Sequence, residues 1–449
     1  MSNGAPLSFT RKELPFLVLG VFLFIFYASA TALFSDDLRF RESFWFDERD
    51  FLALIKYYYF NWSSRLLIMP VTIVLCQSNI WLWRILDLSF SLILVFNINY
   101  LFNKKSAWLS VALFLLYPFW HMATAGWIAT TTGFLWPLSL GVYCFAFFKR
   151  LYSGARITWE YALFIPALLY ATDAEQAALI LFLVFLYLTA REFFKNSDNK
   201  IYRTTLFVSL IFSGARVIFH LVTPGNAVRA TSLHYTLPNF NEYSLITRLA
   251  LGFELSALHY LQFTVLLFPF FSLFLFLYIF NSHKETYKKI IAAFPLGLSL
   301  VYSIRVAFIT LNNAPALIRD YSGNVADAII MASIPRNFGF WFYIFLYALF
   351  FAALFYSLYL TKPKYLCCGI MGLGFFSQLI LGLANSMYGS ALRTFIYASF
   401  AMIICVLIIY NNGGEEIFAK SKFLKISMGL FLFANVLITY SIAFIRAGL

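Results

Sequence analysis

Two adjacent carboxylates, Asp36 and Asp37, follow directly after the first long apolar run of the chain, residues 14–34. That run carries no charge and is long enough to cross a bilayer. A carboxylate fixed at the end of such a helix can take a proton from a hydroxyl group, and two neighbouring carboxylates can share Mg²⁺ or Mn²⁺. The alternative is structural, with one aspartate capping a helix and the other paired with Arg39 or Arg41. We therefore take Asp36 and Asp37 as candidate catalytic residues and candidate metal ligands.

Arginine and lysine are sorted between alternate loops of the chain. Lysine collects in one set of loops, with Lys56 as the exception, and the positive-inside rule assigns that set to the cytoplasm. Arginine collects in the other set, which is then the outer face. A planar guanidinium group binds phosphate through two hydrogen bonds, so this face favours an anionic ligand, although each arginine could instead pair with a carboxylate or a lipid head group. The outer arginines are Arg39, Arg41, Arg49, Arg65, Arg229, Arg319, Arg336 and Arg393.

Four arginines are the candidate ligands for a phosphate group. Arg216 joins the outer ones because it lies about two turns inside a predicted span, where a buried guanidinium requires a partner. The Pro-Gly-Asn turn at 224–226 could add exposed backbone N–H groups, and a helix start after residues 385–390 could add more. A plain turn is the alternative at 224–226. The candidates are Arg65, Arg216, Arg229 and Arg393.

Several outer segments carry side chains that could contact a sugar. Aromatic rings could stack on sugar faces, while hydroxyl, carboxylate and amide groups could bond to sugar hydroxyls. Each has a structural alternative: tryptophan belongs to interfacial belts, and threonine or acidic residues cap helices. Asp173 in particular is expected to cap the sixth span. The five histidines show no metal-ligand spacing and are assigned no role. The candidates for sugar or acceptor binding are Trp62, Trp127, Thr131, Glu175, Gln176 and Asn226.

The composition places these side chains on a polytopic membrane protein. Hydrophobic residues make up 62% of the 449 residues, charged residues only 12%, and the mean hydropathy is +0.79. A soluble core of this length would not be so apolar. The net charge of +13 is spread over short loops, which argues against a nucleic-acid partner. The five cysteines form no spaced metal motif.

Hydropathy predicts an all-α fold of about 13 transmembrane helices in one domain, 1–449, with the N-terminus inside. Two outer loops, 35–79 and 223–258, are each expected to contain a helix at the membrane interface, over 66–76 and 243–259. No internal repeat or linker divides the chain. The predicted spans are 14–34, 80–102, 107–121, 132–148, 159–171, 177–191, 204–222, 259–280, 290–310, 339–361, 366–385, 393–410 and 425–446.

Together these segments resemble bacterial membrane glycosyltransferases of the C-type (GT-C) superfamily, most closely the O-antigen glucosyltransferase-like proteins of cell-surface polysaccharide gene clusters. The resemblance implies a sugar donor on polyprenyl phosphate, a glycan acceptor outside the bacterial cytoplasmic membrane, and a first-loop aspartate as base or cation ligand. It covers roughly the first half of the chain, and the second half matches only in hydropathy and in Arg393. The pieces that carry it are Ser35-Asp36-Asp37, Trp62-Ser63-Ser64-Arg65, 126–131 with 135–137, Glu175-Gln176, and 224–226 with Arg229.

Two other functions compete with sugar transfer. A polysaccharide polymerase would also use polyprenyl-linked glycans and outward arginines. A transporter of lipid-linked glycans would place charges at the bilayer midplane and repeat one half of the chain in the other. Midplane charges are few (Asp87, Arg216 and Arg305), and no repeat is visible. We therefore rank the transporter third.

Overall fold

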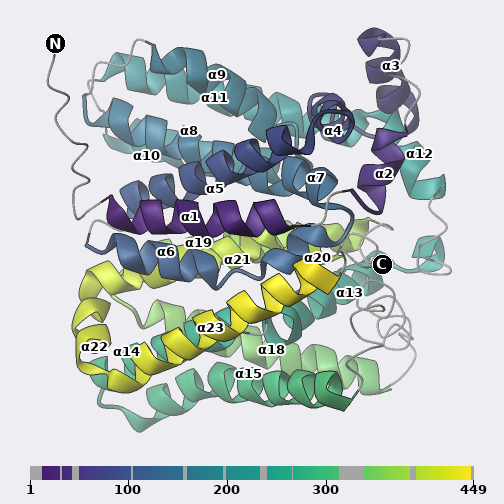
Figure 1. Cartoon of the computed structure of the whole chain (residues 1–449). Helices are drawn as coiled ribbons and strands as arrows, with labels where there is room; N and C mark the ends of the chain where they lie inside the picture. The colour runs from purple at the N-terminus through teal and green to yellow at the C-terminus, as the bar shows by residue number, and fades with distance from the viewer. Residues whose placement is uncertain are drawn as a thin grey trace, which may run out of the picture.

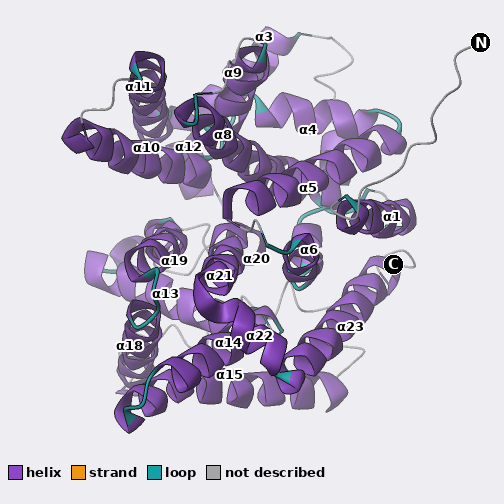
Figure 2. Cartoon of the chain, turned by 90° about the vertical axis from the view of Figure 1, so that its left-hand side faces the viewer, coloured by secondary structure: helices purple, strands orange, loops and turns teal. Residues whose placement is uncertain are grey.

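The computed structural model describes residues 13–30, 33–42, 50–102, 105–154, 159–195, 199–232, 240–264, 266–312, 338–384 and 391–445. Within these ranges the chain is helical and contains no β-strand (Figure 2). Many of these helices are long and apolar. The prediction of an all-α, multi-pass membrane protein is confirmed at this level.

Eight helices in the described ranges are long and apolar enough to cross a membrane, and a bent pair could be a ninth. The bent pair joins Leu245–Phe263 to Leu267–Ser282 at an angle of 86°. The predicted number of 13 spans therefore stays a prediction. The eight are Ile80–Phe102, Trp127–Tyr152, Glu175–Lys195, Lys200–Val222, Gly339–Tyr359, Lys364–Leu383, Leu392–Lys420 and Lys422–Ser441.

The other predicted spans also coincide with helices. Three are short: α1 (Leu14–Ser29), α6 (Ala107–Leu115) and α9 (Glu160–Ala171). The fourth, α15 (Thr286–Asn312), is longer and contains Pro295. Hydropathy thus located helices correctly even where the helix falls short of a bilayer's thickness.

The helices run side by side, and short helices collect at one end of the bundle (Figure 1). The N-terminal half contributes α5 (Ile80–Phe102), α8 (Trp136–Tyr152), α10 (Glu175–Lys195) and α11 (Lys200–Val222), and the C-terminal half contributes α14 (Leu267–Ser282), α18 (Phe338–Tyr359), α19 (Lys364–Leu379) and α23 (Lys422–Ile445). The short helices at this end are α2 (Asp36–Arg41), α3 (Phe51–Asn61), α4 (Ile68–Gln77), α12 (Pro224–Ser232), α13 (Leu245–Leu258) and α20 (Ala391–Thr394), whereas the short helix α22 (Glu415–Lys420) lies at the other end. Both loops predicted to hold interfacial helices therefore contain helices, α4 and α13.

Helix α21 (Ile396–Ile409) forms the centre of the bundle and lies between the two halves in Figure 2. All of its 14 residues except Ile404 are buried. A helix that is apolar on every side is stable only when other helices surround it. Helix α20, which contains Arg393, directly precedes α21 in the chain. Arg393 therefore lies at the end of the bundle where the short helices α2, α3, α4 and α12 gather.

Lysine side chains close the opposite end of the bundle. Lys149 Nζ donates to the carbonyl oxygens of Tyr100 and Leu101, at 2.6 and 3.2 Å, and so satisfies the last turn of α5. Lys105 pairs with Glu415 at 2.5 Å. This is the end that the positive-inside rule assigns to the cytoplasm.

Candidate functional site

Asp37 is held by the start of a helix. Its carboxylate accepts hydrogen bonds from the backbone N–H groups of Ile128, at 3.2 Å, and Ala129, at 2.8 Å. These residues belong to α7 (Trp127–Thr130), which continues into α8. Asp37 is fully buried, and burial raises its pKa to about 7, against the opposing effect of the two N–H donors. The capping alternative therefore describes the observed contacts of Asp37.

Gly126 makes this capping contact possible. Its φ of +97° lies in the left-handed region, and a Cβ atom added there would come within 2.4 Å of the Asp37 carboxyl group. Only glycine lets the carboxylate approach the backbone at this point. The small residue at this position of the threonine-rich segment thus has a packing role.

Asp36 has a different environment. Its side chain is 42% exposed and lies 3.9 Å from the guanidinium of Arg393, measured from Oδ2 to Nη1. The Asp36 N–H donates to the carbonyl oxygen of Ala125 at 3.2 Å, which fixes the backbone of α2 against the start of α7. Of the two adjacent carboxylates, Asp36 is the one open to a substrate.

Arg65 and Glu175 form an ion pair beside this position. Arg65 donates to Oε2 of Glu175 from Nε, at 2.8 Å, and from Nη2, at 2.7 Å. The guanidinium also lies over the ring of Phe134, 5.1 Å from its centroid, and that of Arg393 lies 5.9 Å from the same centroid. One aromatic ring therefore holds two arginines that come from distant parts of the sequence.

Arg216 is bound by Asp173. Its Nη2 group donates to Asp173 Oδ1, and its Nε donates to the carbonyl oxygen of Thr172 at 3.3 Å. The other carboxylate oxygen accepts the N–H groups of Leu67 and Ile68, at 2.9 and 2.8 Å, at the start of α4. The expectation that Asp173 caps the sixth span was wrong, because its side chain reaches a different helix, α4.

The Pro-Gly-Asn segment is helical and not an open turn. Pro224 begins α12, where proline fits the first turn because its missing N–H is not needed there. A Cβ atom on Gly225 would come within 2.5 Å of the carbonyl oxygen of Tyr58, so α12 packs tightly on the end of α3. The Asn226 N–H donates to Thr223 at 3.2 Å. The segment is therefore the first turn of a helix, and the N–H group of Asn226 is already used by Thr223.

Asn226 instead binds its neighbours through its side chain. Its Oδ1 accepts the N–H of Ser64 at 3.3 Å, and its Nδ2 donates to Ser64 Oγ at 3.0 Å and to the carbonyl oxygen of His220 at 2.9 Å. Arg229 Nη2 also donates to Oδ1, at 3.5 Å. Asn226 thus joins α11, α12 and the turn between α3 and α4.

The remaining sugar candidates differ in access. Trp127 is buried against Phe26, and the Thr131 hydroxyl donates to the Trp127 carbonyl oxygen at 2.9 Å and lies 3.0 Å from Trp83 Nε1. Gln176 donates from Nε2 to the carbonyl oxygens of Ser377 and Thr394, at 2.9 and 3.3 Å, which ties α10 to α19 and α20. Trp62 is half-buried, with Arg39 over its ring at 5.2 Å.

Two residues of this cluster, His220 and Tyr397, had no role in the sequence-based prediction, and Ser64 entered it only as part of the segment Trp62–Arg65. His220 lies four residues after Arg216, so helical spacing places the two on one face of α11. Tyr397 lies four residues after Arg393 and interacts electrostatically with Arg65. Helical spacing from the chosen arginines is the signal that could have found both. Arg49, Arg319, Arg336 and residues 385–390 lie outside the described residues.

A cation fits the acidic pair poorly. Both oxygens of Asp37 already accept backbone N–H groups, which leaves Asp36 as a single open carboxylate. Among the described residues, no group of three or more histidine, cysteine or acidic side chains could hold a metal ion.

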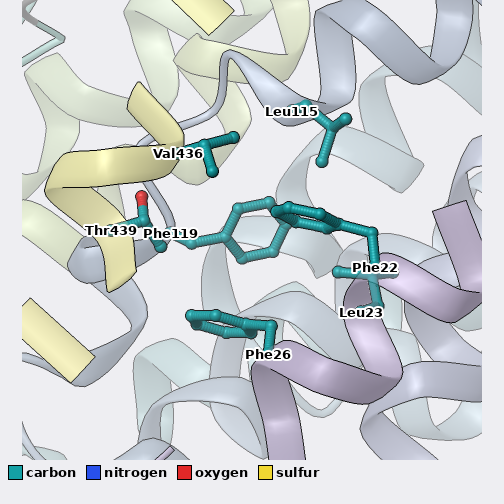
Figure 3. Close-up of a pocket in the computed structure, with 7 residues that line it drawn as sticks. All are labelled: Phe22, Leu23, Phe26, Leu115, Phe119, Val436 and Thr439. Carbon is teal, nitrogen blue, oxygen red and sulfur yellow. The ribbon is translucent and has the colours of Figure 1, made fainter. Parts of the chain in front are cut away.

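A small apolar pocket lies apart from the charged cluster, between α1, α6 and α23 (Figure 3). Phenylalanine, leucine and valine side chains line it, and Thr439 contributes the one hydroxyl group among the lining side chains. It presents no acid, base or cation. The lining residues are Phe22, Leu23, Phe26, Leu115, Phe119, Val436 and Thr439.

Comparison with known proteins gives no match: no family model, no curated protein and no solved structure is similar to this chain at a significant level. The fold and the site alone define the class: a multi-pass helical membrane protein with an arginine-rich charged cluster among the short helices at one end.

Proposed function

We propose that the protein is a bacterial membrane glycosyltransferase of the GT-C type, which moves a sugar from a polyprenyl-phosphate carrier to a cell-surface glycan outside the cytoplasmic membrane. One observation carries the proposal. Asp36, the exposed carboxylate, lies beside Arg393, and Arg393 shares the ring of Phe134 with Arg65. A carboxylate that could accept a proton and two guanidinium groups that could bind phosphate are thus neighbours, although they come from α2, the α3–α4 turn and α20.

In this proposal Asp36 is the base. It takes the proton of the acceptor hydroxyl, whose oxygen then bonds to the anomeric carbon of the donor sugar as the bond from that carbon to the phosphate oxygen breaks. The polyprenyl phosphate leaves with the bonding electrons. Arg393, Arg65 and Arg229 stabilise the negative charge that builds up on the phosphate.

The other candidates have supporting parts in this scheme. Asp37 positions α2 by capping α7, and Arg216 positions α4 through Asp173. Trp62 and the exposed part of Glu175 are the side chains that we assign to the sugar, since both are only partly buried. Gln176 and Asn226 are also partly buried, but their amide groups already bond to backbone groups. Trp127 and Thr131 act through packing.

The test is a pair of matched substitutions, Asp36→Asn and Asp37→Asn, which change one carboxylate each. We expect Asp36→Asn to lower sugar transfer by about 100-fold or more, as for loss of a general base, and Asp37→Asn to lower it by less than about tenfold in protein that remains folded. Transfer is measured with purified protein in detergent, a polyprenyl-phosphate-linked sugar and the acceptor glycan. Full transfer by a well-folded Asp36→Asn variant would contradict the assignment.

A further inference from the structure

His220 lies at the back of the arginine cluster with a defined hydrogen-bond arrangement. Its Nε2 is 2.9 Å from the carbonyl oxygen of Thr172, and its Nδ1 is 2.7 Å from the hydroxyl oxygen of Ser64. A carbonyl oxygen can only accept, so Nε2 must carry a proton. In neutral His220 the Nδ1 atom is therefore an acceptor, and the Ser64 hydroxyl donates to it.

Ser64 has a second acceptor in reach. Its hydroxyl oxygen is 3.4 Å from Oε1 of Glu175, and it accepts a hydrogen bond from Asn226 Nδ2 at 3.0 Å. The orientation of the Asn226 amide is fixed by two backbone groups. Its Oδ1 accepts the N–H of Ser64, and its Nδ2 donates to the carbonyl oxygen of His220. The Ser64 proton thus has two positions, toward His220 or toward Glu175.

The charge of His220 selects between these positions. When Nδ1 gains a proton it becomes a donor to Ser64, and the Ser64 hydroxyl must turn to Glu175. Glu175 then gains a hydrogen bond at Oε1, while its Oε2 holds Arg65. Protonation of His220 therefore supplies Glu175 with a partner that can replace part of its contact with Arg65.

Charges on three sides of His220 act on its protonation. Glu175 from α10 and Asp173 before α10 favour an imidazolium, whereas Arg216 from α11 and burial oppose it, and Glu175 also interacts with Arg65 and Arg229. An anion on Arg65 and Arg229 competes with Glu175 for these guanidinium groups. It also adds negative charge that stabilises an imidazolium nearby.

We propose that an anion bound by Arg65 and Arg229 is taken up together with a proton on His220 Nδ1, and that Ser64 relays this change to Glu175. The inference rests on the proposed function, in which the anion is the phosphate ester of the lipid-linked donor. His220 is a positioning residue here, because it acts on the arginines through Ser64 and Glu175.

Inorganic sulfate is a suitable probe because it stays dianionic between pH 5.5 and 8. Its apparent affinity is measured from the rise in melting temperature of the purified protein in detergent, against chloride at equal ionic strength. We expect the affinity of the wild type to increase by up to about tenfold for each unit that the pH falls, as for one coupled proton. In His220→Gln this dependence should be lost.

His283→Gln is the matched control, because Nε2 of His283 also faces a carbonyl oxygen, that of Leu360 at 3.0 Å, but outside the cluster. It should behave as the wild type. Ser64→Ala, which keeps the histidine and removes the relay, should also flatten the dependence and serves if His220→Gln does not fold. Equal pH dependence in the wild type and in both relay variants would overturn the inference and leave the phosphate site intact.

The donor site itself has a separate test. Absence of any sulfate effect on the wild type, or an effect unchanged in Arg229→Gln, would overturn the phosphate site and the inference together. Polyprenyl phosphate and a short-chain phosphatidylglycerol are then compared as ligands in the same detergent. Tighter binding of polyprenyl phosphate supports the donor as occupant, whereas tighter binding of phosphatidylglycerol would assign the site to membrane head groups and contradict the proposal.

Discussion

Two aspartates that are neighbours in sequence have opposite environments at the scale of the residue. Asp37 points into the start of α7 and is fully buried, whereas Asp36 is partly exposed beside Arg393. From the sequence, both aspartates are candidate catalytic residues, with capping as the alternative. The sequence could not divide the roles, because the division depends on Ile128 and Ala129, which lie about ninety residues further along the chain.

The buried carboxyl group of Asp37 predicts a pH dependence of stability. Its pKa in the folded protein is raised to about 7 by burial, from an ordinary value near 3.8. The folded state therefore binds the proton more tightly than the unfolded state, and this favourable contribution is lost as the pH rises from about 4 to about 7. Between pH 5 and 8 the wild type should lose at most about 3 kcal/mol from this group.

Thermal unfolding in detergent at several pH values measures this effect. We expect Asp37→Asn to show a flatter decline in melting temperature over that range than the wild type. Asp36→Asn removes a carboxylate from the adjacent, half-exposed position and should keep most of the wild-type slope, losing only the part by which the Asp36 charge raises the pKa of Asp37. Parallel curves for the wild type and Asp37→Asn would show that Asp37 does not titrate there.

At the scale of the element, hydropathy predicts the helices well and the contacts between them poorly. Every predicted span coincides with a helix, because a long apolar run leaves its backbone no other way to satisfy its hydrogen bonds in a membrane. The start of α12 at Pro224 was missed, since proline suits both a turn and a first helical turn. Asp173 was assigned to the wrong helix because its true partner, α4, is distant in sequence.

The junction of α2 and α7 depends on one glycine. Gly126→Ala should destabilise the protein by several kcal/mol, because a left-handed φ of +97° is combined with a Cβ atom 2.4 Å from the Asp37 carboxyl group. Gly154→Ala is the matched control: its φ of +79° is similar, but no atom lies within 4 Å of the added Cβ. It should cost about 1–2 kcal/mol. Melting temperatures should therefore fall in the order wild type, Gly154→Ala, Gly126→Ala, and equal values for the two variants would contradict the role of Gly126.

At the scale of the whole molecule, the number of crossings depends on short helices such as α9. Its 12 residues span about 18 Å, against about 30 Å of hydrocarbon. Yet α9 connects the two ends of the bundle. At one end Glu160 pairs with Arg150, near the end of α8, at 3.0 Å, and just beyond the other end Asp173 binds the start of α4. We therefore expect α9 to cross, with the bilayer thinned around it or the helix ends embedded.

Crossing by α9 fixes which ends of its neighbours share a side of the membrane. If α9 crosses, the C-terminal ends of α8 and α10 both face the cytoplasm. If α9 does not cross, these two ends face opposite sides of the membrane. Single cysteines at Ser153 and Phe194, both exposed, test this with a membrane-impermeant maleimide on intact cells. We expect neither to react until the membrane is permeabilised, while a cysteine at Leu52, which is 62% exposed on α3, should react at once.

The wild type sets the background, since its five cysteines are buried or half-buried. Reaction of Phe194→Cys but not Ser153→Cys on intact cells would mean that α9 does not cross, and the site built on the α9–α10 turn would then need a different orientation in the membrane.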